Sequence, residues 1–385
     1  MMSRGLVAIA LAVVVYVGVA GAVSLHAAQD PTTPPTSLAN ALPPNADGEY
    51  IFKNNCATCH GPDGKGSPRS VIGFDAPLPD FTDCSTNTVE PFGDWNSVVH
   101  RGGPIRGLDH HMPAFGDALS DAQIESVVKY LWSLCDNPAW PRGDLNFPRA
   151  FFTEKAFPES EFIWTTGITG SGSKSVGNVL QYEHRIRQRS QYEVSVPLNL
   201  EQTGQGQSWS RGLGDVEFAL RRAFYANLDK TLIIAAGGAV TLPTGKEELG
   251  LGDGVTIWEP FAMFGKGIGA NGFIQMHAGI ELPSNTDKKP RETFLRGVYG
   301  YTYAVDHGFG RAWTPMAEVV TAREFGGDVE MDIIPQMQVS LSKLQHILLD
   351  VGVSIPATER QGRHPQFLAY FLWDWFDGGL FQYWH

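Results

Sequence analysis

The residues best suited to do chemistry are two cysteines and a histidine in the run CATCH, which spans residues 56–60. Two thiols separated by two residues and followed at once by a histidine form the attachment pattern for c-type haem, in which each thiol bonds a vinyl group and the histidine ligates the iron. A thioredoxin-like site would need a preceding strand, and a structural zinc site a second ligand pair. Neither context is present, so Cys56, Cys59 and His60 predict a covalent haem.

An iron held by one histidine needs a second axial ligand to remain six-coordinate, and the run HHMPAFG at residues 110–116 offers three. Met112 is the preferred choice, because a methionine opposite a histidine raises the haem potential. His110 and His111 are the alternatives and would form a bis-histidine site. Core packing would be another role for Met112, but a polar loop with a following proline explains it poorly.

Short helices must position these residues. The segment before the motif, residues 47–55, has a helical pattern, and residues 94–101 have another that ends at a glycine pair. Ser120 and Gln123 form a capping box for a third helix, which ends near residues 137–138. Its apolar residues follow helical spacing and are Ile124, Val127, Val128, Leu131 and Leu134.

Residues 45–138 resemble a class I monohaem cytochrome c, with the CATCHG site, the MPAFG loop and the helix DAQIESVVKYLWSL in that family's order. The resemblance covers about a quarter of the chain. It implies an all-α domain whose C-terminal helix packs across the N-terminal one. It also implies one covalent haem c, with Cys56 and Cys59 as thioether residues and His60 and Met112 as axial ligands.

Two further cysteines, Cys84 and Cys135, lie in the same domain. An even pair in an exported protein suggests a disulfide, which would stabilise the domain by about 2–4 kcal/mol. Two separate buried thiols are the alternative.

The N-terminus indicates export. Residues 1–29 combine Arg4, an apolar run and small residues, and they resemble a signal peptide; an uncleaved anchor is the alternative. Residues 30–44 form a Pro-rich linker. Residues 139–160 contain three prolines and no clear period, which predicts a connector. Fully extended it would reach about 65 Å and let the haem domain move.

Beyond residue 161 the pattern changes to strand alternation. Ile347, Leu349, Val351, Val353 and Ile355 share one face of a segment, and about twelve such segments recur. A soluble β-sandwich would also show this alternation. Segment length, an even count, export and the terminal aromatics favour an antiparallel transmembrane β-barrel over residues 161–385.

The runs GLGDVEFALRRAFYAN and TLIIAAGGAVTLPTGKEELGLGDG, with the strand containing RAWTPMAEVV, resemble outer-membrane transporters associated with phenol-degradation pathways. That family implies a barrel and says little about what passes through it. Its members commonly end in an aromatic residue, whereas this chain ends in His385. Three histidines of this region, His184, His277 and His346, are expected to line the lumen, with a metal role as the lesser alternative.

A cytochrome c joined to a barrel resembles the fused cytochrome-porin proteins that take electrons from extracellular iron(II). The resemblance implies one-electron transfer at the outer membrane, between an external donor such as Fe(II) and periplasmic electron-transfer proteins. A barrel of twelve strands is too narrow for a domain about 30 Å across, so we expect the haem at the periplasmic mouth.

The alternative function is a solute channel whose cytochrome serves a periplasmic oxidase or dehydrogenase. A haem peroxidase would need an open sixth position, which Met112 closes, so a non-enzymatic carrier is favoured. The formal net charge of −12 provides no basic stripe and makes nucleic acid an unsuitable partner.

Overall fold

The computed structural model describes residues 42–43, 46–76, 78–170, 174–202, 209–305, 308–359 and 361–374. The expected signal peptide, nearly all of the Pro-rich linker and the terminal His385 lie outside these residues. Within the described part of the chain, no helix is both long enough and apolar enough to cross a membrane.

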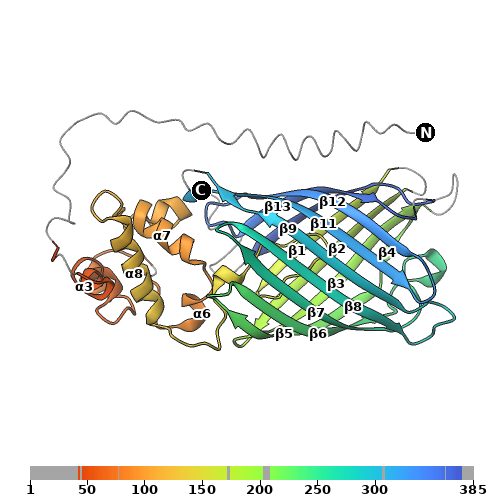
Figure 1. Ribbon diagram of the computed structural model, residues 1–385, viewed down its shortest axis with the longest axis horizontal. Coiled ribbons are helices and arrows are strands. Elements are labelled where there is room, and N and C mark those ends of the chain that lie inside the picture. Colours follow the sequence, from red (N-terminus) through yellow and green to blue (C-terminus); the bar gives the residue numbers. More distant parts are fainter. Residues whose placement is uncertain are drawn as a thin grey trace. The chain divides into compact units, whose positions relative to one another are not determined.

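The first part of the described chain is all helical (Figure 1). Its α-helices are α3 (Gly48–Asn55), α4 (Ala57–His60), α5 (Arg69–Ile72), α6 (Cys84–Asn87), α7 (Phe92–Arg101) and α8 (Asp121–Ser133), with the 3₁₀ helix η1 (Gly103–Arg106) after α7. The Asp47 carboxylate caps α3, and Ser120 and Gln123 form the predicted capping box of α8. Capping satisfies the free amides of a first helical turn, so both helices begin where the sequence indicates.

Helices α3 and α8 pack closely against each other. A Cβ at position 48 would lie only 2.0 Å from the Ser126 carbonyl oxygen, so a glycine is needed at this contact. Ile51 and Phe52 of α3 are fully buried. They share a core with the predicted apolar face of α8, of which Ile124, Val127, Val128 and Leu131 are buried.

A disulfide joins Cys84 in α6 to Cys135, with the two Cα atoms 5.4 Å apart. Two polar side chains reinforce this end of the domain. The Asn87 amide donates to the carbonyl oxygens of Phe81 (2.7 Å) and Leu131 (2.9 Å), and the Arg142 guanidinium donates to that of Cys135 (2.7 Å).

Residues 161–374 form one closed antiparallel sheet (Figure 1). Its long strands are β1 (Glu161–Thr169), β2 (Ser175–Ile186), β3 (Ser190–Gln202), β5 (Val216–Asn227), β6 (Leu232–Leu242), β7 (Ile257–Ile268), β8 (Gly272–Pro283), β9 (Glu292–Tyr301), β11 (Ala312–Glu324), β12 (Val329–Ser340), β13 (Ile347–Pro356) and β14 (Gln366–Asp374). Strand β1 pairs with both β2 and β14, which closes the ring.

The barrel therefore has the twelve strands that the sequence predicts. The sheet contains fourteen strand segments, of which two are short extensions of longer strands. Segment β4 (Trp209–Leu213) pairs with β3 and extends β5, and β10 (Tyr303–Ala304) pairs with β11 and extends β9.

The two faces of the barrel differ in polarity. On β13, Val351, Val353 and Ile355 point outward and are 37–40% exposed, whereas Asp350 and Ser354 point inward and are buried. An apolar outer face and a polar interior, in a closed barrel with an even number of strands, are the features of an outer-membrane barrel. The predicted alternation is confirmed from Val351 to Ile355, whereas Ile347 at the start of the strand is buried, at 3% exposed.

The prediction that three histidines line the lumen is correct for His277 only. His277 is 2% exposed on the inner face of β8. His184 follows the buried, lumen-facing Glu183 and so points outward, where its ring lies 5.5 Å from that of Tyr192. His346 precedes β13, and its Nε2 lies 3.0 Å from a Glu90 carboxylate oxygen. None of the three belongs to a three-ligand cluster within the described residues.

The connector differs most from its prediction. Residues 139–160 begin with a short 3₁₀ helix, η2 (Gly143–Leu145), and then pack within the barrel instead of forming a free, movable linker. Arg149, Thr153, Lys155 and Glu159 are at most 4% exposed. The Phe147 ring stacks on Phe273 of β8 at 5.8 Å. The freedom predicted from extended length is therefore lost to contacts in the lumen.

Buried charges hold the connector to the barrel wall. The Glu183 carboxylate, which is fully buried, accepts from Arg149 of the connector at 2.7 Å and from Arg221 of β5 at 2.8 Å. On the opposite wall, the Glu318 carboxylate of β11 accepts from the Thr153 hydroxyl at 2.8 Å and from the Thr153 amide at 2.5 Å. Glu183 and Glu318 thus each meet a donor that the connector supplies.

We predict that Glu183→Ala destabilises the protein by about 3–5 kcal/mol, because the substitution leaves buried guanidinium groups without their shared partner. Urea unfolding in detergent micelles, followed by tryptophan fluorescence, measures this change. The control is Glu247→Ala, which removes an exposed ion pair with Lys288 and should cost no more than about 1 kcal/mol. Equal effects of the two substitutions would mean that the buried network does not secure the connector.

The carboxyl group of Asp144 in η2 predicts that the free energy of unfolding depends on pH. Its carboxylate accepts from the Phe92 amide at 3.1 and 3.2 Å, and burial raises the pKa of Asp144 to about 6. The folded protein therefore keeps a proton that the unfolded chain releases near pH ~4. The contribution of Asp144 to the free energy of unfolding is greatest below that pH and is lost as the pH rises through about 6.

Asp144→Asn keeps an acceptor for the Phe92 amide and should remove this loss of stability. We expect the variant to be more stable than the wild type at neutral pH and to show a flatter profile below it. Unfolding is measured across this pH range by near-ultraviolet circular dichroism. The control is Asp136→Asn, which removes an exposed carboxyl group. A profile that Asp144→Asn leaves unchanged would contradict it.

Candidate haem site

The CATCH motif adopts a helical turn. The His60 amide donates to the Cys56 carbonyl oxygen at 3.0 Å, and Gly61 ends the turn with a φ of 76°. Cys56, Cys59 and His60 therefore stand at positions i, i+3 and i+4, which share one helix face. Neither cysteine takes part in the Cys84–Cys135 disulfide. The turn thus presents two thiols and an imidazole together, as covalent haem attachment requires.

Burial tunes the protonation of these groups. It lowers the pKa of His60, which keeps the imidazole neutral at neutral pH and able to ligate a metal. Burial, with a contribution from Cys59, raises the pKa of Cys56 to about 11. The His60 ring lies 5.0 Å from that of Phe81, and Phe81 in turn contacts the Trp95 ring at 5.3 Å. An apolar wall thus stands behind the imidazole.

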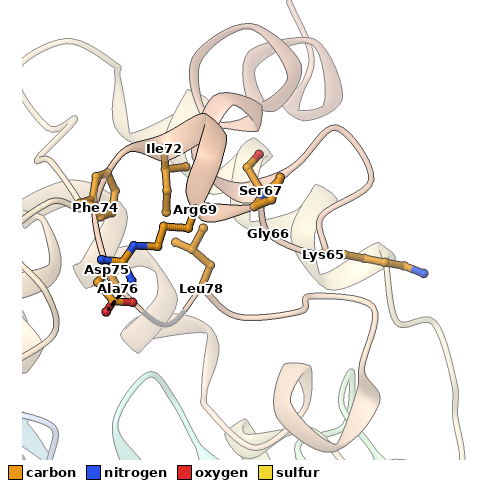
Figure 2. A pocket seen from close by; sticks show the side chains of 10 residues that line it. Lys65, Gly66, Ser67, Arg69, Ile72, Phe74, Asp75, Ala76 and Leu78 are labelled. Atoms are coloured by element: carbon orange, nitrogen blue, oxygen red, sulfur yellow. Dashed lines mark ion pairs between the residues drawn. The ribbon is translucent and has the colours of Figure 1, made fainter.

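A cavity of about 350 Å³ adjoins the motif and is lined by residues between Lys65 and Leu78 (Figure 2). Its wall is bonded directly to the motif, because the Gly66 amide donates to the His60 carbonyl oxygen and the Ser67 amide to that of Cys59, each at 2.8 Å. Phe74 forms part of the lining. The loop that follows the histidine therefore shapes an opening beside the motif, although none of the four predicted haem residues is among its lining residues.

Met112 lies in the loop between η1 and α8. The Gly103 amide donates to the Met112 carbonyl oxygen at 3.0 Å. A Cβ at position 102 would lie 2.9 Å from that oxygen, and one at position 103 would lie 3.2 Å from the Met112 Cβ. The glycine pair after α7 thus lets the methionine loop approach closely, and Met112 packs against the helical core.

The two alternative ligands are placed differently. His110 and His111 are exposed, and the His111 Nδ1 lies 2.6 Å from a carboxylate oxygen of Asp109. The half-buried position of Met112 favours it as the axial ligand over both histidines. Its ligation of the iron, like the roles assigned to Cys56, Cys59 and His60, stays a prediction.

Several buried polar atoms near the motif have no protein partner. They are His60 Nδ1, Trp95 Nε1, and Nε and Nη1 of Arg106, which is 2% exposed. A buried donor without an acceptor costs about 1–3 kcal/mol. A haem brings propionate oxygens that can accept hydrogen bonds from Trp95 Nε1 and from the unpartnered nitrogens of Arg106, so these two residues fit the group. Arg106 belongs to no motif in the sequence, and the glycine that follows it, Gly107, is the only local signal.

The comparisons with known proteins agree with this site. A family model described as cytochrome C oxidase, cbb3-type, subunit III matches residues 43–131. The chain is 32% identical over 90 residues to cytochrome c6 of Gracilaria tenuistipitata var. liui, an alignment that covers 23% of this chain and 72% of that protein.

The barrel region is similar to solved channels. An outer membrane channel from Pseudomonas putida F1 is 13% identical with a TM-score of 0.40, over 59% of this chain and 99% of that chain. The KdgM porin is 9% identical with a TM-score of 0.35, over 56% and 99% of the two chains. The NanC porin is 10% identical with a TM-score of 0.38, over 55% and 98%.

The fold and the motif define a helical haem-binding domain joined to an outer-membrane β-barrel. Through its N-terminal domain the chain belongs to the cytochrome c family, and that domain carries one covalently bound haem c. The cofactor expected from CATCH and the expected class of domain are thereby confirmed.

Met112→Ala should abolish the methionine-to-iron charge-transfer absorbance of the oxidised protein, because a methyl side chain cannot ligate iron. It should also lower the midpoint potential, since the methionine sulfur favours the reduced iron. Visible spectra and a redox titration of the purified protein measure both effects. Met316→Ala, a buried methionine of β11, is the control. An unchanged absorbance in Met112→Ala would reject the ligand assignment.

Proposed function

We propose that this protein is a one-electron carrier anchored in the outer membrane, with its haem domain on the periplasmic side. The haem supplies a single redox centre. Cys56 and Cys59 would attach it, and His60 and Met112 would hold its iron. The periplasmic partners are electron-transfer proteins.

The lengths of the strand connections support this orientation. At the barrel end that holds Glu161 and Asp374, the connections span residues 187–189, 228–231, 269–271, 305–311 and 341–346. At the opposite end they span residues 170–174, 203–208, 243–256, 284–291, 325–328 and 357–365. Three of these six contain eight or more residues, whereas none of the first five exceeds seven. Outer-membrane barrels have short periplasmic turns and longer extracellular loops, so the connector would enter from the periplasm.

The single observation that carries the proposal is the packing of the connector, residues 139–160, inside the barrel. Its contacts with Glu183 of β2, Phe273 of β8 and Glu318 of β11 reach around the wall of one barrel half. These contacts make the barrel an anchor for the haem domain. They also narrow the lumen, which makes a wide solute channel serving a periplasmic oxidase or dehydrogenase the weaker candidate.

Extracellular Fe(II) is the electron donor that we propose. Carboxylates in the barrel half that faces the longer loops support a donor that is a cation. Glu217, Glu259, Glu281 and Glu292 share the inner face of four strands by alternation with buried residues, and Glu281 pairs directly with Glu292 across β8 and β9. All four lie toward the end with the longer loops. A lumen lined by carboxylates concentrates cations and repels anions.

Whole cells test this donor. Cells that carry the oxidised protein should show reduced haem within seconds of exposure to free Fe(II), and the combined substitutions Glu217→Gln, Glu259→Gln and Glu281→Gln should slow that reduction several-fold. Glu247→Gln and Glu248→Gln, two exposed carboxylates of a loop, form the control. Reduction of the haem by periplasmic donors alone, with no response to external Fe(II), would refute the extracellular route and leave the periplasmic carrier in place.

A further inference from the structure

The loop that leads into Met112 brings together three side chains that bind metals. One ligand atom each from Asp109, His110 and His111 lies within 4.8 Å of the others. Across the described ranges of the chain, this is the one group of three or more His, Cys, Asp and Glu residues that meets this spacing. All three residues are exposed, so a solvated ion reaches them directly.

Local contacts hold this group in place before any ion arrives. The Asp109 carboxylate accepts from the His111 amide at 2.8 Å, and the Met112 amide donates to the Asp109 carbonyl oxygen at 3.2 Å. The His111 ring stacks on Phe74 at 4.0 Å with a 5° angle between the planes. The His110 ring lies 4.1 Å from that of His111. Stacking on Phe74 holds the His111 imidazole, and the His110 Nδ1 lies 3.4 Å from the same Asp109 carboxylate oxygen.

Two imidazoles and one carboxylate form the ligand set that proteins use for ferrous iron when other positions remain open to water. Hard carboxylate-only sites would prefer Mg²⁺ or Ca²⁺, and thiolate sites would prefer Zn²⁺ or Cu(I). The mixed set at residues 109–111 therefore favours a first-row divalent ion.

We propose that Asp109, His110 and His111 bind Fe(II) and form the point at which its electron enters the haem domain. This inference rests on the proposed function, since it names the place where the donor binds. One Fe(II) loses one electron and becomes Fe(III), and one ferric haem iron becomes ferrous. No bond breaks and no proton is required. Met112 follows His111 directly in the chain, which places the proposed ion site on the loop that carries the predicted axial ligand.

The first experiment measures metal binding without redox chemistry. Zn(II) alone is titrated calorimetrically into the oxidised, haem-loaded full-length protein in detergent. We expect one site, with affinity at least tenfold weaker in Asp109→Asn and in His111→Ala. The control is His364→Ala, which removes another exposed histidine. Zn(II) binding that neither Asp109→Asn nor His111→Ala weakens would overturn the proposed site.

The second experiment measures electron entry. Fe(II) is mixed with the oxidised protein, and haem reduction is followed by stopped-flow absorbance. We expect a rate that saturates with Fe(II) and falls at least tenfold in both variants, while the rate with ascorbate stays the same. The methionine-to-iron absorbance and the midpoint potential must be unchanged in both variants, which separates loss of the ion site from a disturbed Met112.

The outcomes distinguish this inference from the function on which it rests. Equal Fe(II) rates in the wild type and both variants would refute this entry point and leave Fe(II) as the donor. No reduction of the wild-type haem by Fe(II), despite Zn(II) binding at residues 109–111, would refute both Fe(II) as the donor and electron entry through this site. A loss of the methionine-to-iron absorbance in His111→Ala would overturn the inference by making His111 part of the haem site.

Discussion

The buried pairing of Glu183 with Arg149 and Arg221 is the interaction on which the relation between the two halves of this chain depends. A lone charge in a low-dielectric interior is costly, and removal of one partner leaves the others unpaired. The barrel therefore needs the cation that the connector supplies, and the connector needs the carboxylates that the barrel supplies. Lys155 strengthens this dependence, because its ammonium pairs with Glu161 at the start of β1 at 3.2 Å.

This mutual dependence makes the connector part of the barrel. A chain of this length outside a barrel would be a flexible spacer, and a haem domain attached to it would sample a wide volume. Docked between β2, β8 and β11, the connector instead ties the haem domain to one barrel end by a short path. Electron transfer at a membrane benefits from such a tether, because the carrier stays close to the surface where its partners arrive.

Buried charges hold segments together in the lumen, whereas close backbone contacts at glycines do so within the haem domain. Gly48 lets α3 cross α8, and Gly102 and Gly103 let the methionine loop approach the end of α7. These contacts bring Met112 toward the helical core and leave residues 109–111 at the surface. The same loop thus separates a packed side chain that suits the haem from exposed side chains that suit a dissolved ion.

The sequence by itself determined the covalent cofactor, the helical domain and the twelve-stranded barrel, because each depends on local spacing: the CATCH motif, the capping box at Ser120, and the alternation of strands such as Ile347–Pro356. Only the tertiary structure decided where the connector lies, that His184 points outward, and that Asp109, His110 and Phe74 meet around His111. These features depend on residues far apart in the chain or on strand register. A one-residue change of register reverses the face of every side chain, and local patterns do not fix it.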